Sequence, residues 1–151
     1  MKTVKSLTLA AVAVMLLLQP AIARADDHGA AKVTFVKWVT AEIQLPGLLE
    51  TLEGVVDGDI GQGAFTGEVL KETIVGNLDE IVAFYHFQGS QHSFSAIVHL
   101  NFDLVANKAE LIGVVTDGWL KGHAVSGVMI ALDEFQGHSP AFAAAIKIQK
   151  N

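Results

Sequence analysis

Hydrophobic and polar residues follow one another along most of this chain in short runs. Stretches rich in Val, Ile, Phe and Thr are separated by clusters of Gly, Asn and Asp, which is the pattern of strands joined by turns. Segment 48–53 is ambiguous, because it follows Pro46-Gly47 and could instead form a helical turn. The pattern predicts strands at residues 32–42, 48–56, 61–70, 81–87, 92–102, 109–115, 121–132 and 142–149.

One expected hairpin can be paired residue by residue. Gly89-Ser90 fits a two-residue type II′ turn, which favours glycine at its first position. Pairing outward from this turn sets Phe87 opposite His92 and Tyr85 opposite Phe94. The face that contains these residues is almost wholly apolar, whereas the other face is mixed. Because a slip of one residue would exchange the two faces, we expect the face with Tyr85 to be buried.

Glycines crowd two parts of the chain, residues 54–67 and 113–127. Glycine inside a strand often marks a bulge or a bend where a barrel turns a corner. Closure would also remove the edges that such an apolar sheet would otherwise expose. We therefore expect an all-β fold, namely a single closed antiparallel barrel of about eight strands.

The beginning of the chain differs in composition from the rest. Two lysines precede an apolar run at residues 7–18, and Ala23 and Ala25 have the spacing of a cleavage site. This is the pattern of a secretory signal peptide, and the run is too short for a membrane-spanning helix. We expect a secreted or periplasmic protein with three parts: a signal peptide at 1–25, a flexible leader at 26–31 and the β-barrel domain at 32–151.

Charge and cysteine content exclude several functions. The chain has a formal net charge of −6, and lysine is the only cation that remains after the expected cleavage. An acidic protein of this kind is not expected to bind nucleic acid. No second apolar run reaches the length of a membrane span. The absence of cysteine excludes disulfides, thiol catalysis and thiolate metal sites. The oligomeric state stays unknown.

Three stretches together resemble a known family. They are Gly-Gln-Gly-Ala-Phe-Thr-Gly-Glu-Val-Leu at 61–70, Phe-Tyr-His-Phe at 84–87 followed by His-Ser-Phe-Ser-Ala at 92–96, and the glycine-rich segment 113–127. In this order they resemble the small barrels of the allene oxide cyclase and dirigent superfamily, over about residues 54–132. The resemblance implies an eight-stranded barrel with an apolar cavity. It transfers no catalytic residue to this chain.

Aromatic side chains are the candidate ligand-binding residues. Barrels of about eight strands either fill their interior with side chains or hold one small ligand. If this barrel has a cavity, we expect an apolar ligand to contact Trp38, Tyr85, Phe87, His92, Phe94 and Trp119. The alternative is that these side chains only fill the core.

A metal site is expected only at the new amino terminus. Cleavage after Ala25 would expose Asp26, Asp27 and His28, which resemble the amino-terminal copper and nickel motif of serum albumins. A free amine, two peptide nitrogens and an imidazole offer four nitrogens in a plane, a geometry that suits Cu(II) or Ni(II). Such binding would be adventitious, and no cofactor is expected to be required. Asp57 and Asp59 could hold a loop calcium, but a solvated turn explains them better.

Three functions stay open at this point. The preferred one is a secreted barrel that binds a small apolar ligand or acts as a scaffold. The second is an enzyme whose cavity guides an isomerisation or a cyclisation, although no catalytic residue can be assigned. The third is a structural or interaction protein. A titratable group that faces an apolar interior would favour the enzyme, and a solidly packed interior would favour the third function.

Overall fold

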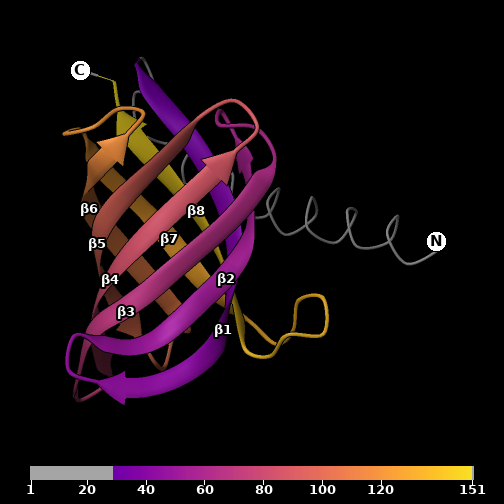
Figure 1. The fold of residues 1–151 in the computed structure, drawn as a ribbon. Helices are drawn as coiled ribbons and strands as arrows, with labels where there is room; N and C mark the ends of the chain where they lie inside the picture. Colours follow the sequence, from indigo (N-terminus) through magenta and orange to yellow (C-terminus); the bar gives the residue numbers. More distant parts are fainter. Residues whose placement is uncertain (1–28, 151) are drawn as a thin grey trace.

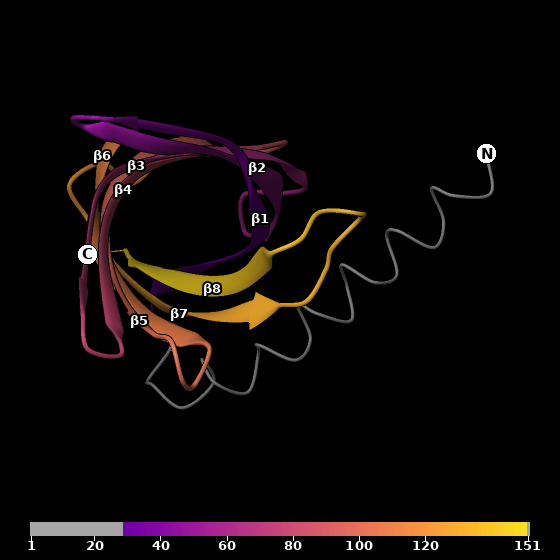
Figure 2. The ribbon, with the colours of Figure 1, turned by 90° about the horizontal axis from the view of Figure 1, so that it is seen from below.

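The computed structural model describes residues 29–150, which form one closed barrel of eight antiparallel strands (Figures 1 and 2). Each strand pairs with the next along the chain, and β8 pairs with β1. The strands are β1 (Ala30–Leu45), β2 (Leu48–Gly58), β3 (Gly63–Val75), β4 (Leu78–Gly89), β5 (Ser93–Asp103), β6 (Lys108–Gly118), β7 (Ala124–Leu132) and β8 (Ala141–Gln149). The predicted fold class is confirmed, and the ambiguous segment 48–53 is part of a strand.

Connections alternate between the two ends of the barrel. The end that is lower in Figure 1 contains the β1–β2, β3–β4, β5–β6 and β7–β8 connections, and we call it the lower end. The opposite, upper end contains the other three connections and the carboxyl terminus of β8. No described residue belongs to a helix that is long and apolar enough to cross a membrane.

The barrel interior is built by the two-residue period of the strands. On β4, Ala83, Tyr85 and Phe87 are fully buried, whereas Phe84 and His86 between them are half-buried on the outer face. Successive side chains of a strand point to opposite faces, so each strand contributes every second residue to the core. The prediction that the face with Tyr85 is buried is therefore confirmed.

Five aromatic rings fill the middle of the barrel. Neighbouring rings have centroids 4.5–6.2 Å apart, in stacked and edge-to-face arrangements that suit aromatic packing. Gly67 makes room for them, since a Cβ atom there would lie 3.1 Å from Cδ1 of Tyr85 and 3.2 Å from Cζ of Phe65. We call this set the aromatic cluster; its members are Phe35, Phe65, Tyr85, Phe87 and Phe94.

The predicted β4–β5 register is wrong by two residues. Phe87 pairs with Phe94, and Tyr85 pairs with Ala96. The Gly89 amide donates to the His92 carbonyl at 3.0 Å, so the two turn residues are 90 and 91. Gly89 is needed for close packing instead, because a Cβ atom there would lie 2.1 Å from the Ile60 carbonyl oxygen. A slip of two residues keeps every side chain on its face, which is why the predicted faces are nevertheless correct.

A second, smaller core lies outside the barrel. Val36 and Trp38 of β1 face outward, where they pack with small residues of β8 and with Phe135 of the β7–β8 connection. The indole of Trp38 stacks on the His138 ring with centroids 4.2 Å apart and an interplanar angle of 5°. The β7–β8 connection therefore covers Trp38, which does not face the barrel interior.

Candidate functional site

The structure separates the six residues that the sequence predicts to contact a ligand. Tyr85, Phe87 and Phe94 belong to the aromatic cluster in the barrel interior. His92 and Trp119 stack on each other at the upper end, with centroids 4.2 Å apart. Trp38 lies in the outer core. A single ligand in the interior could thus contact the first three but not Trp38.

The predicted metal ligands Asp26, Asp27 and His28 lie outside the described residues. Within residues 29–150, no group of three or more His, Cys, Asp or Glu side chains could hold a metal ion. Asp57 and Asp59 accept hydrogen bonds from the backbone amides of Gly58 and Lys32, at 2.7 and 2.9 Å. These carboxylates therefore stabilise a turn, as expected for the solvated-turn alternative.

A group of titratable side chains occurs where the interior approaches the lower end. Lys37 on β1 lies two residues after Phe35 and four after Val33, so its side chain is on the same inner face of the strand as theirs. The other members of the group come from β2, β3 and β4. Each of them interacts electrostatically with at least one other member of the group. We call this group the polar cluster; its members are Lys37, Glu50, Glu72, Asp79 and Tyr85.

A one-residue irregularity in β3 places Glu72 in the polar cluster. The β3–β4 register shifts between Val69 and Lys71, so that Glu72 pairs with Ile81. Directly paired residues share a face of the sheet, and Ile81 packs against the interior core. The shift therefore turns Glu72 toward the inner face, where it hydrogen-bonds Asp79.

Lys37 is the buried cation of the polar cluster. Its side chain is 6% exposed, and its Nζ atom lies 5.2 Å from the ring centroid of Tyr85 and 5.3 Å from that of Phe142. Burial lowers the pKa of Lys37 to about 8, although the charge of Glu50 acts in the opposite direction. About one tenth of the amine is then uncharged at pH 7, far more than for a solvent-exposed lysine.

Asp79 and Glu50 of the polar cluster hold their protons more firmly than carboxyl groups usually do. Burial, the hydrogen bond with Glu72 and the negative charges of Glu72 and Glu50 raise the pKa of Asp79 to about 7. Burial and the charge of Glu72 also raise the pKa of Glu50, and Lys37 opposes this change. Two carboxyl groups can hydrogen-bond to each other only when one is protonated. Asp79 can therefore donate or accept a proton near neutral pH.

Two atoms of the polar cluster are buried without a hydrogen-bond partner among the described residues: Tyr85 Oη and Asp79 Oδ1. Leaving a buried polar atom unsatisfied costs about 1–3 kcal/mol, so buried polar groups of native proteins are generally hydrogen-bonded to protein or to another molecule. Burial and the charge of Glu50 raise the pKa of Tyr85, so its hydroxyl stays protonated. The polar cluster thus offers Lys37 and Tyr85 as donors, and the charge of Glu50 acts on both of them.

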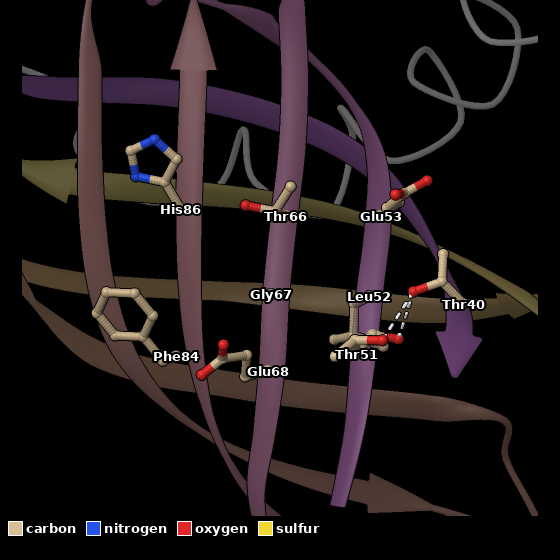
Figure 3. Close-up of a pocket in the computed structure, with 9 residues that line it drawn as sticks. All are labelled: Thr40, Thr51, Leu52, Glu53, Thr66, Gly67, Glu68, Phe84 and His86. Carbon is tan, nitrogen blue, oxygen red and sulfur yellow. Dashed lines mark hydrogen bonds between the residues drawn. The ribbon is translucent and has the colours of Figure 1, made fainter. Parts of the chain in front are cut away.

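A groove on the outer face of β2, β3 and β4 is the alternative site (Figure 3). It has a volume of about 290 Å³, and Glu53, Thr66 and His86 form one row across it. Its main polar groups already have partners: Thr40 Oγ1 lies 2.9 Å from Thr51 Oγ1, and His86 Nδ1 lies 2.8 Å from Ser95 Oγ. None of the buried polar atoms without a partner among the described residues belongs to this groove, whereas two of them belong to the polar cluster.

Sequence reasoning missed four of the five members of the polar cluster. Lys37 could have been found, because it continues the two-residue period of Val33 and Phe35 in an apolar stretch. Asp79 and Glu50 are also in phase with buried residues of their strands, Ala83 and Leu52. Glu72 gave no such signal, because the irregularity in β3 breaks the alternation before it.

No family model, curated protein or solved structure matches this chain. The resemblance to the allene oxide cyclase and dirigent superfamily is thus supported only in its architecture, an antiparallel closed barrel of eight strands.

Proposed function

We propose that this chain is a secreted or periplasmic barrel that binds a small, mostly apolar molecule at the polar cluster. The observation that supports it best is that Tyr85 Oη is buried without a partner among the described residues, while the Tyr85 ring lies 5.2 Å from the buried Lys37 amine. Specific small-molecule sites are commonly apolar with a few convergent polar groups. The rings of Tyr85 and Phe142 supply the apolar part next to the Lys37 amine.

The charges of the polar cluster favour a ligand with an uncharged oxygen group. A carboxylate on the ligand would be attracted by Lys37 but repelled by Glu50 and Glu72, and a cation would be attracted by the carboxylates but repelled by Lys37. A hydroxyl or carbonyl oxygen can instead accept a hydrogen bond from Lys37 or Tyr85 without either repulsion. We therefore expect apolar alcohols, aldehydes and ketones to bind better than acids or amines of the same size.

Cinnamyl alcohol, an apolar molecule with one hydroxyl group, is a suitable probe for titration calorimetry. We expect saturable binding of one molecule per chain. Tyr85→Phe should weaken it roughly two- to tenfold, because this variant removes one hydrogen bond worth about 0.5–1.5 kcal/mol and little volume. The control Thr40→Val, which alters the outer groove, should leave the affinity unchanged. Absence of binding, or loss of affinity only in Thr40→Val, would contradict the proposal.

Acid–base catalysis is the second candidate function. The pKa of Asp79 is about 7 and that of Lys37 is about 8, so both groups change protonation near neutral pH, which is a property of catalytic groups. An isomerisation or cyclisation of the bound molecule would fit the family that the sequence resembles. If ligand is converted to product and Asp79→Asn stops the conversion while binding persists, the protein is an enzyme of this type.

Secretion and copper binding are proposed on the sequence alone. Cleavage after Ala25 should give a mature protein that binds one Cu(II) through Asp26, Asp27 and His28, with the visible absorption of a planar four-nitrogen site. Binding should weaken as the pH falls, because the ligating nitrogens must lose protons. His28→Ala should abolish the absorption and His86→Ala should not. An exported protein whose intact mass begins at Arg24, or whose absorption survives in His28→Ala, would contradict this proposal.

A further inference from the structure

Lys37 differs from every other lysine of the described residues. It is the only one that is buried, whereas the other six are half-buried or exposed; these are Lys32, Lys71, Lys108, Lys121, Lys147 and Lys150. An amine in an apolar environment loses the hydration that normally keeps it protonated. A buried lysine of this kind is suited to attack a carbonyl carbon, since only the uncharged amine is a nucleophile.

We propose that Lys37 binds an apolar aldehyde covalently, as an imine between its Nζ atom and the aldehyde carbon. This inference rests on the proposed ligand site and specifies the chemical class of its ligand. The geometry supports it because the Nζ atom lies next to two aromatic rings, 5.2 Å from the centroid of Tyr85 and 5.3 Å from that of Phe142. An aldehyde with an apolar or aromatic body would pack between or against these rings.

The neighbouring groups can supply the proton transfers that imine formation needs. The uncharged Nζ atom attacks the carbonyl carbon, a C–N bond forms as the π bond of the carbonyl group breaks, and one proton passes from the nitrogen to the oxygen, which becomes a hydroxyl group. A carboxyl group of the cluster donates a proton to this hydroxyl, the C–O bond breaks, and water leaves. The nitrogen then returns a proton to the carboxylate. The products are the imine and one water molecule, so no oxidant or reductant is required.

Two members of the polar cluster are suited to assist this step. Glu50 lies close enough to Lys37 for its charge to stabilise the ammonium form, and the same charge would stabilise the positively charged imine from which the last proton leaves. Tyr85 Oη is buried and without a partner among the described residues, so it is free to donate a hydrogen bond to the carbonyl oxygen. Such a bond would polarise the carbonyl group toward attack.

The test uses cinnamaldehyde as the aldehyde and sodium cyanoborohydride to reduce the imine to a stable secondary amine. After partial reaction of the wild-type chain at pH 7, peptide mapping by mass spectrometry measures the modification of each lysine. We expect Lys37 to react at least about tenfold faster than any other lysine, because a much larger fraction of its amine is uncharged. Equal modification of the exposed lysines, or an unmodified Lys37, would overturn the inference.

Two variants and one unreactive analogue separate this inference from the proposed function. Lys37→Arg keeps a positive charge but cannot form the imine, so its rapid adduct should disappear, whereas Lys71→Arg should retain it. Cinnamyl alcohol cannot form an imine. If it binds at the polar cluster but the aldehyde does not modify Lys37, the covalent inference fails and the binding function stands. If neither the alcohol nor the aldehyde binds, both fail.

Discussion

Replacing Phe35 with alanine should lower the free energy of unfolding by about 4 kcal/mol, the usual size for a buried Phe→Ala change. Phe35 is fully buried, and its ring contacts those of Phe65, Tyr85 and Phe87 at centroid distances of 5.0, 5.8 and 5.1 Å. The substitution would thus leave a cavity in the middle of the aromatic cluster. Denaturant unfolding followed by circular dichroism measures the change.

Phe84→Ala is the matched control, because it deletes the same side chain from the outer face of β4. Phe84 is only half-buried, so we expect this variant to lose less than half as much stability as Phe35→Ala. If the order of the two variants were reversed, the assignment of inner and outer faces would be wrong.

Replacing Lys37 with methionine should stabilise the barrel at pH 7, by about 2 kcal/mol, because an apolar side chain of similar length replaces a buried charge. The pKa of Lys37 is about 8 in the folded state, against 10.5 for an ordinary lysine. Between these two pH values the unfolded chain binds more protons than the folded one, so the stability of the wild type rises with pH. The advantage of Lys37→Met should therefore fall by about 3 kcal/mol from pH 8 to pH 10.5, so that at the upper end of this range the wild type becomes the more stable protein.

Denaturant unfolding across this pH range measures the difference in the free energy of unfolding between Lys37→Met and wild type. This difference reports on Lys37 rather than on the other groups that titrate. Glu50, Glu72, Asp79 and Tyr85 are present in both proteins, and Lys71→Met provides an exposed control whose difference from wild type should stay flat. If the difference in the free energy of unfolding between Lys37→Met and wild type did not change with pH, the pKa of Lys37 would not be lowered in the folded protein.

The barrel could be predicted because the two-residue alternation of a strand identifies its buried face even when the predicted register is wrong by two residues. The pattern around Tyr85 and Phe94 identifies the buried face, and a wrong register of two residues leaves that face unchanged. The exact partners depend on the turn, and here Gly89 serves the approach of the Ile60 carbonyl rather than the expected turn type. A close contact between segments that are far apart in the chain cannot be recognised from the residues around Gly89.

The candidate site was less predictable than the fold. Aromatic residues were chosen as ligand contacts by type, but the side on which Trp38 lies depends on the β7–β8 connection that packs over it. The polar cluster depends on groups that meet across four strands, and on the irregularity near Val69 that turns Glu72 inward. A carboxylate in a strand is normally expected on the solvent side, so the inward turn of Glu72, which stays exposed, becomes visible only in three dimensions.

Mapping of bound cinnamyl alcohol by NMR tests the central claim most directly, because the change in each backbone amide signal reports where the ligand lies. We predict that the largest changes occur around the polar cluster, in β1 near Lys37, β2 near Glu50 and β4 near Asp79 and Tyr85. Changes confined to the outer groove around Thr40 and His86, changes at the His92–Trp119 pair of the upper end, or no change at saturating ligand would contradict a ligand site at the polar cluster.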